Sequence, residues 1–210
     1  MTTSRRGRAI RSGIVLLAAT ALGIGIGAVA TRSADDPSAT PANDSAEAGF
    51  VRDMSTHHGQ AVSMADAIRS RTQDPLLAAL ATDIVLTQQS QIGRFSGWLD
   101  QWGLPMTSLD APMSWAQGHT ATSTSMDMEA MPGMATNDEI RQLDSLPLDQ
   151  AEVLFLNLMI RHHRGGVEMA ETVLTITGRD EVRRIAQSIV TSQQSEIDAM
   201  QSMLDERAST

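Results

Sequence analysis

Residues 155–163 read FLNLMIRHH, and residues 50–58 read FVRDMSTHH, 105 positions earlier in the chain. The same shift, without a gap, aligns further residues of the two halves: Val62, Met64, Ala65, Ile84, Val85, Gln88, Gln89, Ser90, Ile92 and Leu99 with Val167, Met169, Ala170, Ile189, Val190, Gln193, Gln194, Ser195, Ile197 and Leu204. A single register kept over about 50 residues is the signature of an internal repeat. The chain therefore contains a duplication, and both copies are expected to fold alike.

Each copy has the pattern of two helices joined by a tight turn. In the first copy, apolar residues recur at helical spacing from about 46 to 71 and from 76 to about 102, with a break at Gln73-Asp74-Pro75. Pro75 suits the first turn of the second helix, and Asp74 suits its N-cap. The second copy predicts two helices between about 147 and 207, on either side of a turn at Gly178. We therefore predict an all-α fold, a four-helix bundle built from two duplicated antiparallel helical hairpins.

The two predicted hairpins, at residues 47–103 and 147–207, belong to one predicted domain at 47–207 and should contain no strand. A long crossing connection at residues 104–146 joins them, and its length is more than a plain loop needs. The connection is rich in Met, and its residues 126–134 read MDMEAMPGM. Its last part, residues 137–146, predicts a short helix.

The charge and the composition exclude several classes of function. Arg supplies all 16 basic residues against 25 acidic ones, which gives a net charge of −9, or −13 when residues 1–30 are left out. Such a surface repels phosphate, so nucleic acid is excluded as a partner and cations are favoured. Cys is absent, which excludes disulfides, zinc–thiolate sites and thiol catalysis.

Residues 1–30 have the parts of an export signal: four Arg residues, an apolar stretch at 14–30 and a small-residue ending, Ala28-Val29-Ala30. The alternative is an uncleaved membrane anchor at 14–30, because a spanning helix needs about 17–25 residues. Residues 31–46 are small and polar and predict a disordered tether. In both cases the body is expected outside the cytoplasm, secreted or in the cell envelope. A contact with the membrane is expected only through the N-terminal segment, and only if that segment is not cleaved.

Four of the five His residues form two His-His pairs, one in each copy. On a helix, Met54 and His58 share a face, and Met64 lies two turns beyond His57. Imidazole suits copper, zinc, nickel and iron, and thioether favours the soft Cu(I) ion. The predicted metal ligands are His57, His58, His162, His163, Met54, Met64, Met159 and Met169. A secondary set is predicted in the connection: His119, Met126, Met128, Met131 and Met134.

The Gln residues of the second helix in each hairpin are predicted to support these ligands. The turns place His58 opposite Gln89 and His163 opposite Gln194. A Gln side chain on an apolar stripe is costly unless it is hydrogen-bonded. We therefore predict hydrogen bonds to the paired His residues that fix the ring tautomers, from Gln88 or Gln89 in the first copy and from Gln193 or Gln194 in the second.

Three segments resemble the signature of domain-of-unknown-function family 305: residues 155–170, residues 131–136 and the first copy at 54–65. The resemblance covers about residues 47–206. It implies a ferritin-like bundle in an exported bacterial protein, and it implies copper as the ion, because some members are copper-binding proteins of the cell envelope. The first copy has Gly59-Gln60-Ala61 where the second has Arg164-Gly165-Gly166, which allows the copies to differ in affinity.

The leading hypothesis is an exported protein that binds copper, as Cu(I) or Cu(II), and buffers it or passes it to an envelope copper-handling protein. Another divalent metal is an alternative ion. A second hypothesis is a structural or interaction bundle without metal, in which the His residues only fix the helix register. A third is a metal-dependent oxidoreductase, which needs an open coordination position. No enzyme is expected, because the chain lacks the Glu-x-x-His, His-Glu-x-x-His and Gly-x-Ser-x-Gly motifs.

Overall fold

The computed structural model describes residues 40–117 and 131–209, and within these ranges it contains five α-helices, one short 3-10 helix and no strand. The helices are α1 (Ala46–Arg69), α2 (Pro75–Trp102), the 3-10 helix η1 (Ser114–Ala116), α3 (Asn137–Ser145), α4 (Leu148–Ile176) and α5 (Asp180–Ala208). The predicted signal at residues 1–30 and the predicted secondary ligands His119, Met126 and Met128 lie outside the described residues. In the described ranges, no helix is both long and apolar enough to cross a membrane.

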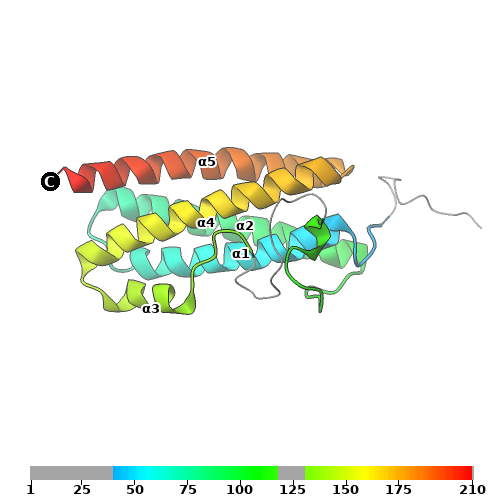
Figure 1. The fold of residues 1–210 in the computed structure, drawn as a ribbon, viewed down its shortest axis with the longest axis horizontal. Coiled ribbons are helices and arrows are strands. Elements are labelled where there is room, and N and C mark those ends of the chain that lie inside the picture. The colour runs from blue at the N-terminus through cyan, green and yellow to red at the C-terminus, as the bar shows by residue number, and fades with distance from the viewer. Residues whose placement is uncertain (1–39, 118–130, 210) are drawn as a thin grey trace, which may run out of the picture. The chain divides into compact units, whose positions relative to one another are not determined.

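The helices pair as two hairpins, as the duplication predicts. α1 packs along α2, α4 packs along α5, and α1 and α4 pack against each other (Figure 1). The short α3 of the connection contacts both α1 and α4. The predicted fold class, a bundle of two helical hairpins with a long connection, is therefore confirmed.

The turn of the first hairpin has the predicted chemistry. The Asp74 side chain accepts hydrogen bonds from the backbone N–H groups of Leu76 and Leu77, at 2.9 and 3.3 Å, and Pro75 begins α2. At the other end of α2, Gly103 has a φ of 67°, the left-handed conformation that favours glycine. α1 ends at Arg69, with Ser70 as its C-cap, two residues before the predicted end at 71.

The core of the bundle consists of two apolar clusters with a polar layer between them. One cluster contains Met64 and Met159, and the other contains Met54 and Met169. On each of the four long helices, the buried residues between the two clusters are polar or glycine. The buried polar residues of this layer, which we call the His layer, are His57, His58, Gln88, Gln91, His162, His163 and Gln193.

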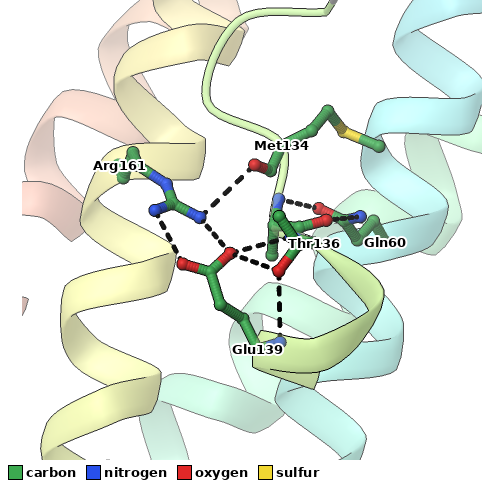
Figure 2. A network of polar contacts seen from close by, with 6 residues as sticks. Gln60, Met134, Thr136, Glu139 and Arg161 are labelled. Carbon is green, nitrogen blue, oxygen red and sulfur yellow. Dashed lines mark hydrogen bonds and ion pairs between the residues drawn. The ribbon is translucent and has the colours of Figure 1, made fainter. Parts of the chain in front are cut away.

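The end of the connection is fixed across α1 and α4 by polar contacts (Figure 2). The Gln60 amide donates to the Ala135 carbonyl at 2.9 Å and accepts from the Ala135 N–H at 2.7 Å. Arg161 forms an ion pair with Glu139 at 2.7 Å, and Glu139 completes a capping box with Thr136 at the start of α3. Residues 131–136 therefore lie directly on the two helices that carry the paired His residues.

Glycine at 165 is required for this close approach. A Cβ atom at Gly165 would lie 2.0 Å from the Pro132 carbonyl oxygen. In the first copy the equivalent position is Gln60, which binds the same segment through its side chain. The sequence difference between the copies at this position is thus explained by the docking of the connection.

We expect the substitution Gly165→Ala to destabilise the fold by about 1–3 kcal/mol, because the added methyl group overpacks the contact with Pro132. Helix propensity alone predicts the opposite sign, a stabilisation of about 0.5–1 kcal/mol. The matched control is Gly59→Ala, because a Cβ atom there meets nothing within 4 Å and should stabilise. Urea unfolding of both variants measures the difference, and equal stabilisation of both would contradict the proposed role of Gly165.

Candidate metal centre

Four imidazole rings lie at the middle of the bundle. α1 supplies His57 and His58, α4 supplies His162 and His163, and none of the four side chains is exposed to solvent. The ring centroids of His57 and His162 lie 3.7 Å apart, with an angle of 33° between the ring planes. Because these two residues are equivalent in the duplication, the two copies meet at this ring pair.

Three of the rings are held through their Nε2 atoms. His57 Nε2–H donates to the Pro132 carbonyl at 3.0 Å, and His163 Nε2–H donates to Glu196 Oε2 at 2.6 Å. His58 Nε2 lies 2.5 Å from Gln91 Oε1. A backbone carbonyl or a carboxylate oxygen only accepts, so in the neutral rings of His57 and His163 the proton is on Nε2 and Nδ1 keeps its lone pair. Among the described residues, the Nδ1 atoms of all four rings and His162 Nε2 have no hydrogen-bond partner.

Burial keeps three of the four rings neutral, those of His57, His58 and His162. Burial lowers the pKa of His57 to about 4 and the pKa of His58 to about 3. Burial also lowers the pKa of His162 well below its usual value of 6.5. A metal ion binds imidazole in its neutral form, so protons compete little for these rings near neutral pH.

The predicted Met ligands lie on both sides of the His layer, and all four are fully buried. Met54 and Met169 belong to one cluster, and Met64 and Met159 belong to the other. Each cluster therefore joins one thioether from each copy, whereas the sequence groups the two thioethers of the same copy. Among the described residues, no three His, Asp or Glu side chains are placed to hold one ion.

The predicted hydrogen bonds from Gln88 or Gln89 and from Gln193 or Gln194 are wrong. Gln88 and Gln193 are buried in the His layer, but their side-chain amides have no partner among the described residues. Gln89 and Gln194 are exposed, and Gln194 bonds to Asp198. The side-chain partners of His58 and His163 are Gln91 and Glu196, which sequence reasoning missed.

The direction of side chains on a helix explains this miss. A helical side chain covers the surface about one position before its own Cα atom. The side chain of His58 therefore lies over the position of residue 57, which the turn sets opposite residue 90. On α2, the position of residue 90 is covered by the side chain of residue 91. The same shift leads from His163 to Glu196. Gln91 and Glu196 could thus have been found from the sequence with this correction.

The described part of the secondary set lies near the His layer. Met131 is 2% exposed and belongs to the same cluster as Met54 and Met169. It also lines a surface cavity of about 290 Å³ together with Met106, which is 49% exposed. Met134 is partly buried against the same cluster. Met131 therefore lies between the solvent-facing cavity and the cluster that carries two predicted thioether ligands.

Asp53 holds the wall of this cavity in place. Its carboxylate accepts hydrogen bonds from the Met113 N–H at 2.7 Å and from the Trp115 Nε1–H at 2.8 Å. A Cβ atom at Gly49 would lie 2.6 Å from the Trp115 ring, so glycine is needed there. Burial raises the pKa of Asp53 above its usual value. These contacts attach the loop after α2 to α1.

Comparison with protein families finds one match over most of the chain. The family described as Domain of unknown function (DUF305) matches residues 47–204. A curated protein, the uncharacterized protein L153 of Acanthamoeba polyphaga mimivirus, is 38% identical over 52 residues, which are 25% of this chain and 34% of that protein. The matched part thus spans about a third of the length of that relative.

Solved structures with the same fold belong to this family or resemble it. A DUF305 protein from Streptomyces coelicolor, described as a candidate secreted protein, is 46% identical, with a TM-score of 0.72 over 80% of this chain and 96% of that one. A DUF305 fragment from Deinococcus radiodurans is 36% identical, with a TM-score of 0.65 over 77% of this chain and 96% of that one. CopM in its Cu(I)-bound form is 25% identical, with a TM-score of 0.58 over 76% of this chain and 96% of that one. CopM has also been solved in a Cu(II)-bound form.

Proposed function

Because the chain belongs to the DUF305 family, we propose that it is an exported copper-binding protein that buffers or transfers copper outside the cytoplasm. The copper-bound structures of CopM and the description of the Streptomyces coelicolor relative support this proposal. The observation that carries it belongs to this chain: four buried imidazoles form one layer, and their Nδ1 atoms have no partner among the described residues.

The residues present fit a soft metal ion. His57, His58, His162 and His163 offer imidazole nitrogen donors, and the thioethers that flank the layer are Met54, Met169, Met64 and Met159. Thioether sulfur favours Cu(I), and imidazole binds both Cu(I) and Cu(II). The Glu196 carboxylate at His163 balances one positive charge, which favours a monovalent ion because uncompensated charge is costly in a buried site.

The alternative without metal leaves the polar atoms of the layer unexplained. A buried donor or acceptor without a partner costs about 1–3 kcal/mol, so a layer that only fixes the helix register is expected to pair its polar groups. Nine buried nitrogen and oxygen atoms, all in His or Gln side chains of this layer, have no partner among the described residues. Metal binding gives the imidazole nitrogens a function that the structural alternative lacks.

A copper titration tests the proposed function. Metal-free protein, purified without an affinity tag, is titrated with Cu(I) under anaerobic conditions and with Cu(II) in air, each against a coloured competing chelator. We expect saturable binding of both ions. If neither Cu(I) nor Cu(II) binds, the structural alternative without metal is favoured.

We further propose that Met131 and the connection that carries it receive Cu(I) on its way to the His layer. Support comes from the position of Met131, which lines the cavity and belongs to the cluster of Met54 and Met169. The neighbouring carbonyl of Pro132 holds His57, so the same segment contacts both the cavity and the layer. His119, Met126 and Met128 remain part of this proposal as further ligands in the connection.

Replacement of Met126, Met128, Met131 and Met134 by Leu is expected to weaken Cu(I) binding and to leave Cu(II) binding at the His residues intact. Leu removes the thioether but keeps the apolar volume, and such exchanges usually cost less than about 1.5 kcal/mol each. The control is Met200→Leu, which makes the same exchange at a fully buried core position that is not a predicted ligand. Titration with both ions measures the effect, and an unchanged Cu(I) affinity would reduce the connection to a docking segment.

A further inference from the structure

Gln91 and Glu196 are equivalent residues that make equivalent contacts. They are 105 positions apart, as the two copies are, and each bonds the second His of its own copy. The Nε2–oxygen distances are 2.5 Å for His58 with Gln91 and 2.6 Å for His163 with Glu196. Both rings are fully buried, and the Nδ1 atom of each has no partner among the described residues. At this contact, the two halves of the His layer differ in one group, an amide against a carboxylate.

The carboxylate fixes the tautomer of His163, whereas the amide leaves two arrangements at His58. A carboxylate oxygen accepts this hydrogen bond, so the neutral His163 ring carries its proton on Nε2, which leaves the lone pair on Nδ1. The amide of Gln91 presents either its oxygen or its NH₂ group after a rotation of 180°. With the NH₂ group forward, His58 Nε2 accepts and the proton moves to Nδ1, which then cannot bind a metal. Because only a fraction of His58 is competent, its apparent affinity falls by that fraction.

The carboxylate also strengthens His163 as a donor. An imidazole that donates its second N–H to a carboxylate is a more basic metal ligand, and such partners commonly change metal affinity by about 10–100-fold. The partly buried Glu196 carboxylate also lies one ring away from a cation bound at His163 Nδ1. Gln91 offers neither effect, because it is neutral.

We propose that Glu196 is a positioning residue that makes the two halves of the His layer unequal. Through Glu196, His163 takes up copper first and more tightly, and His58, held by Gln91, binds second and more weakly. The copper part of this inference rests on the proposed function, whereas the tautomer part does not. The sequence difference that matters for affinity is therefore Gln91 against Glu196.

Three variants of the full chain test the inference. Glu196→Gln gives both halves an amide, and Gln91→Glu gives both halves a carboxylate. Asp198→Asn is the matched control, because it removes the same charge from an exposed position of α5, two residues from Glu196. Each protein is titrated stepwise with Cu(I) and with Cu(II), and the metal-free proteins are studied by long-range ¹H–¹⁵N NMR, which reports the tautomer of each imidazole.

In the unmodified protein we expect two binding steps and a His163 ring protonated only on Nε2. Glu196→Gln should weaken the tighter step by about 10–100-fold, so that the two steps merge, and should give His163 a mixture of tautomers. Gln91→Glu should strengthen the weaker step and fix the tautomer of His58. Asp198→Asn should change neither the two steps nor the tautomers.

The outcomes separate this inference from the proposed function. If the unmodified protein binds copper and Glu196→Gln weakens the tighter step no more than Asp198→Asn does, the inference is wrong and the proposed function stands. If no variant binds copper, the proposed function fails, and the copper part of the inference fails with it. The tautomer part is then tested by NMR alone, and identical tautomers of His58 and His163 would overturn it. If Glu196→Gln does not fold, Gln91→Glu decides, because an unchanged weaker step in that variant contradicts the inference.

Discussion

Replacing both His58 and His163 with Gln is expected to weaken the binding of Cu(I) and of Cu(II) by more than the roughly 10–100-fold that loss of an outer hydrogen-bond partner causes. Each substitution removes one imidazole donor from its copy while it keeps a polar side chain in the His layer. Both rings are fully buried, so no solvent-exposed donor can replace them without opening the bundle. Competition titration with both ions measures the loss.

The control for this double variant is Phe95→Leu. The Phe95 ring lies 6.0 Å from the His58 ring between centroids, so the change disturbs the packing next to the layer without removing a donor atom. On the structural alternative, the double His variant should lose about 1–3 kcal/mol of stability from unpaired buried groups, without any change in metal binding. Unchanged copper affinity in the double variant would overturn the proposed ligands.

Acidification from pH 7 to pH 5 is expected to destabilise the metal-free fold by several kcal/mol. The unfolded chain binds protons on His near the usual pKa of 6.5, whereas the folded chain does not until about pH 4 at His57 and about pH 3 at His58. The contribution of these neutral rings to the free energy of unfolding is therefore fully present above pH 6.5, and it is lost progressively as the pH falls below 6.5. Each such His contributes about 1.4 kcal/mol per pH unit, so His57, His58 and His162 together give about 4 kcal/mol per unit.

Urea unfolding at a series of pH values measures this slope. The interval from pH 6 to pH 5 lies above the usual pKa of Glu, 4.5, so carboxylates contribute little there. The single variant His58→Gln is the control, and it should reduce the slope by about a third, because one of the three shifted rings is gone. A stability that stays constant between pH 7 and pH 5 would show that the rings are not buried in their neutral form.

The sequence by itself determined the helices and their duplication. Helix ends depend on local chemistry, such as the Asp74 cap and Gly103 at the end of α2, and apolar spacing along one helix shows which face is buried. The repeat of 105 positions required two like hairpins, and apolar faces on both hairpins required a bundle. The His pairs and the flanking Met residues were found for the same reason, because their spacing is a property of single helices.

Only the tertiary structure decided which of these side chains meet. The ring contact between His57 and His162 joins residues from different copies, and the two thioethers in each cluster also come from different copies. The hydrogen-bond partners Gln91 and Glu196 lie beyond the predicted Gln residues, because side chains lean toward the N-terminus of their own helix. These pairings depend on the relative shift and rotation of helices, and the spacing within one helix does not contain that information.

The position at which the connection docks on α1 and α4 likewise could not be predicted from patterns in the sequence. Pro132 reaches His57 because Gly165 leaves room for its carbonyl and because Gln60 binds the backbone of Ala135. A backbone segment without helix or strand has no periodicity, so its position follows only from the surfaces it contacts. The helices therefore follow from local sequence. The His layer, the hydrogen-bond partners of its rings and the position of the connection against it depend on how separate surfaces fit together.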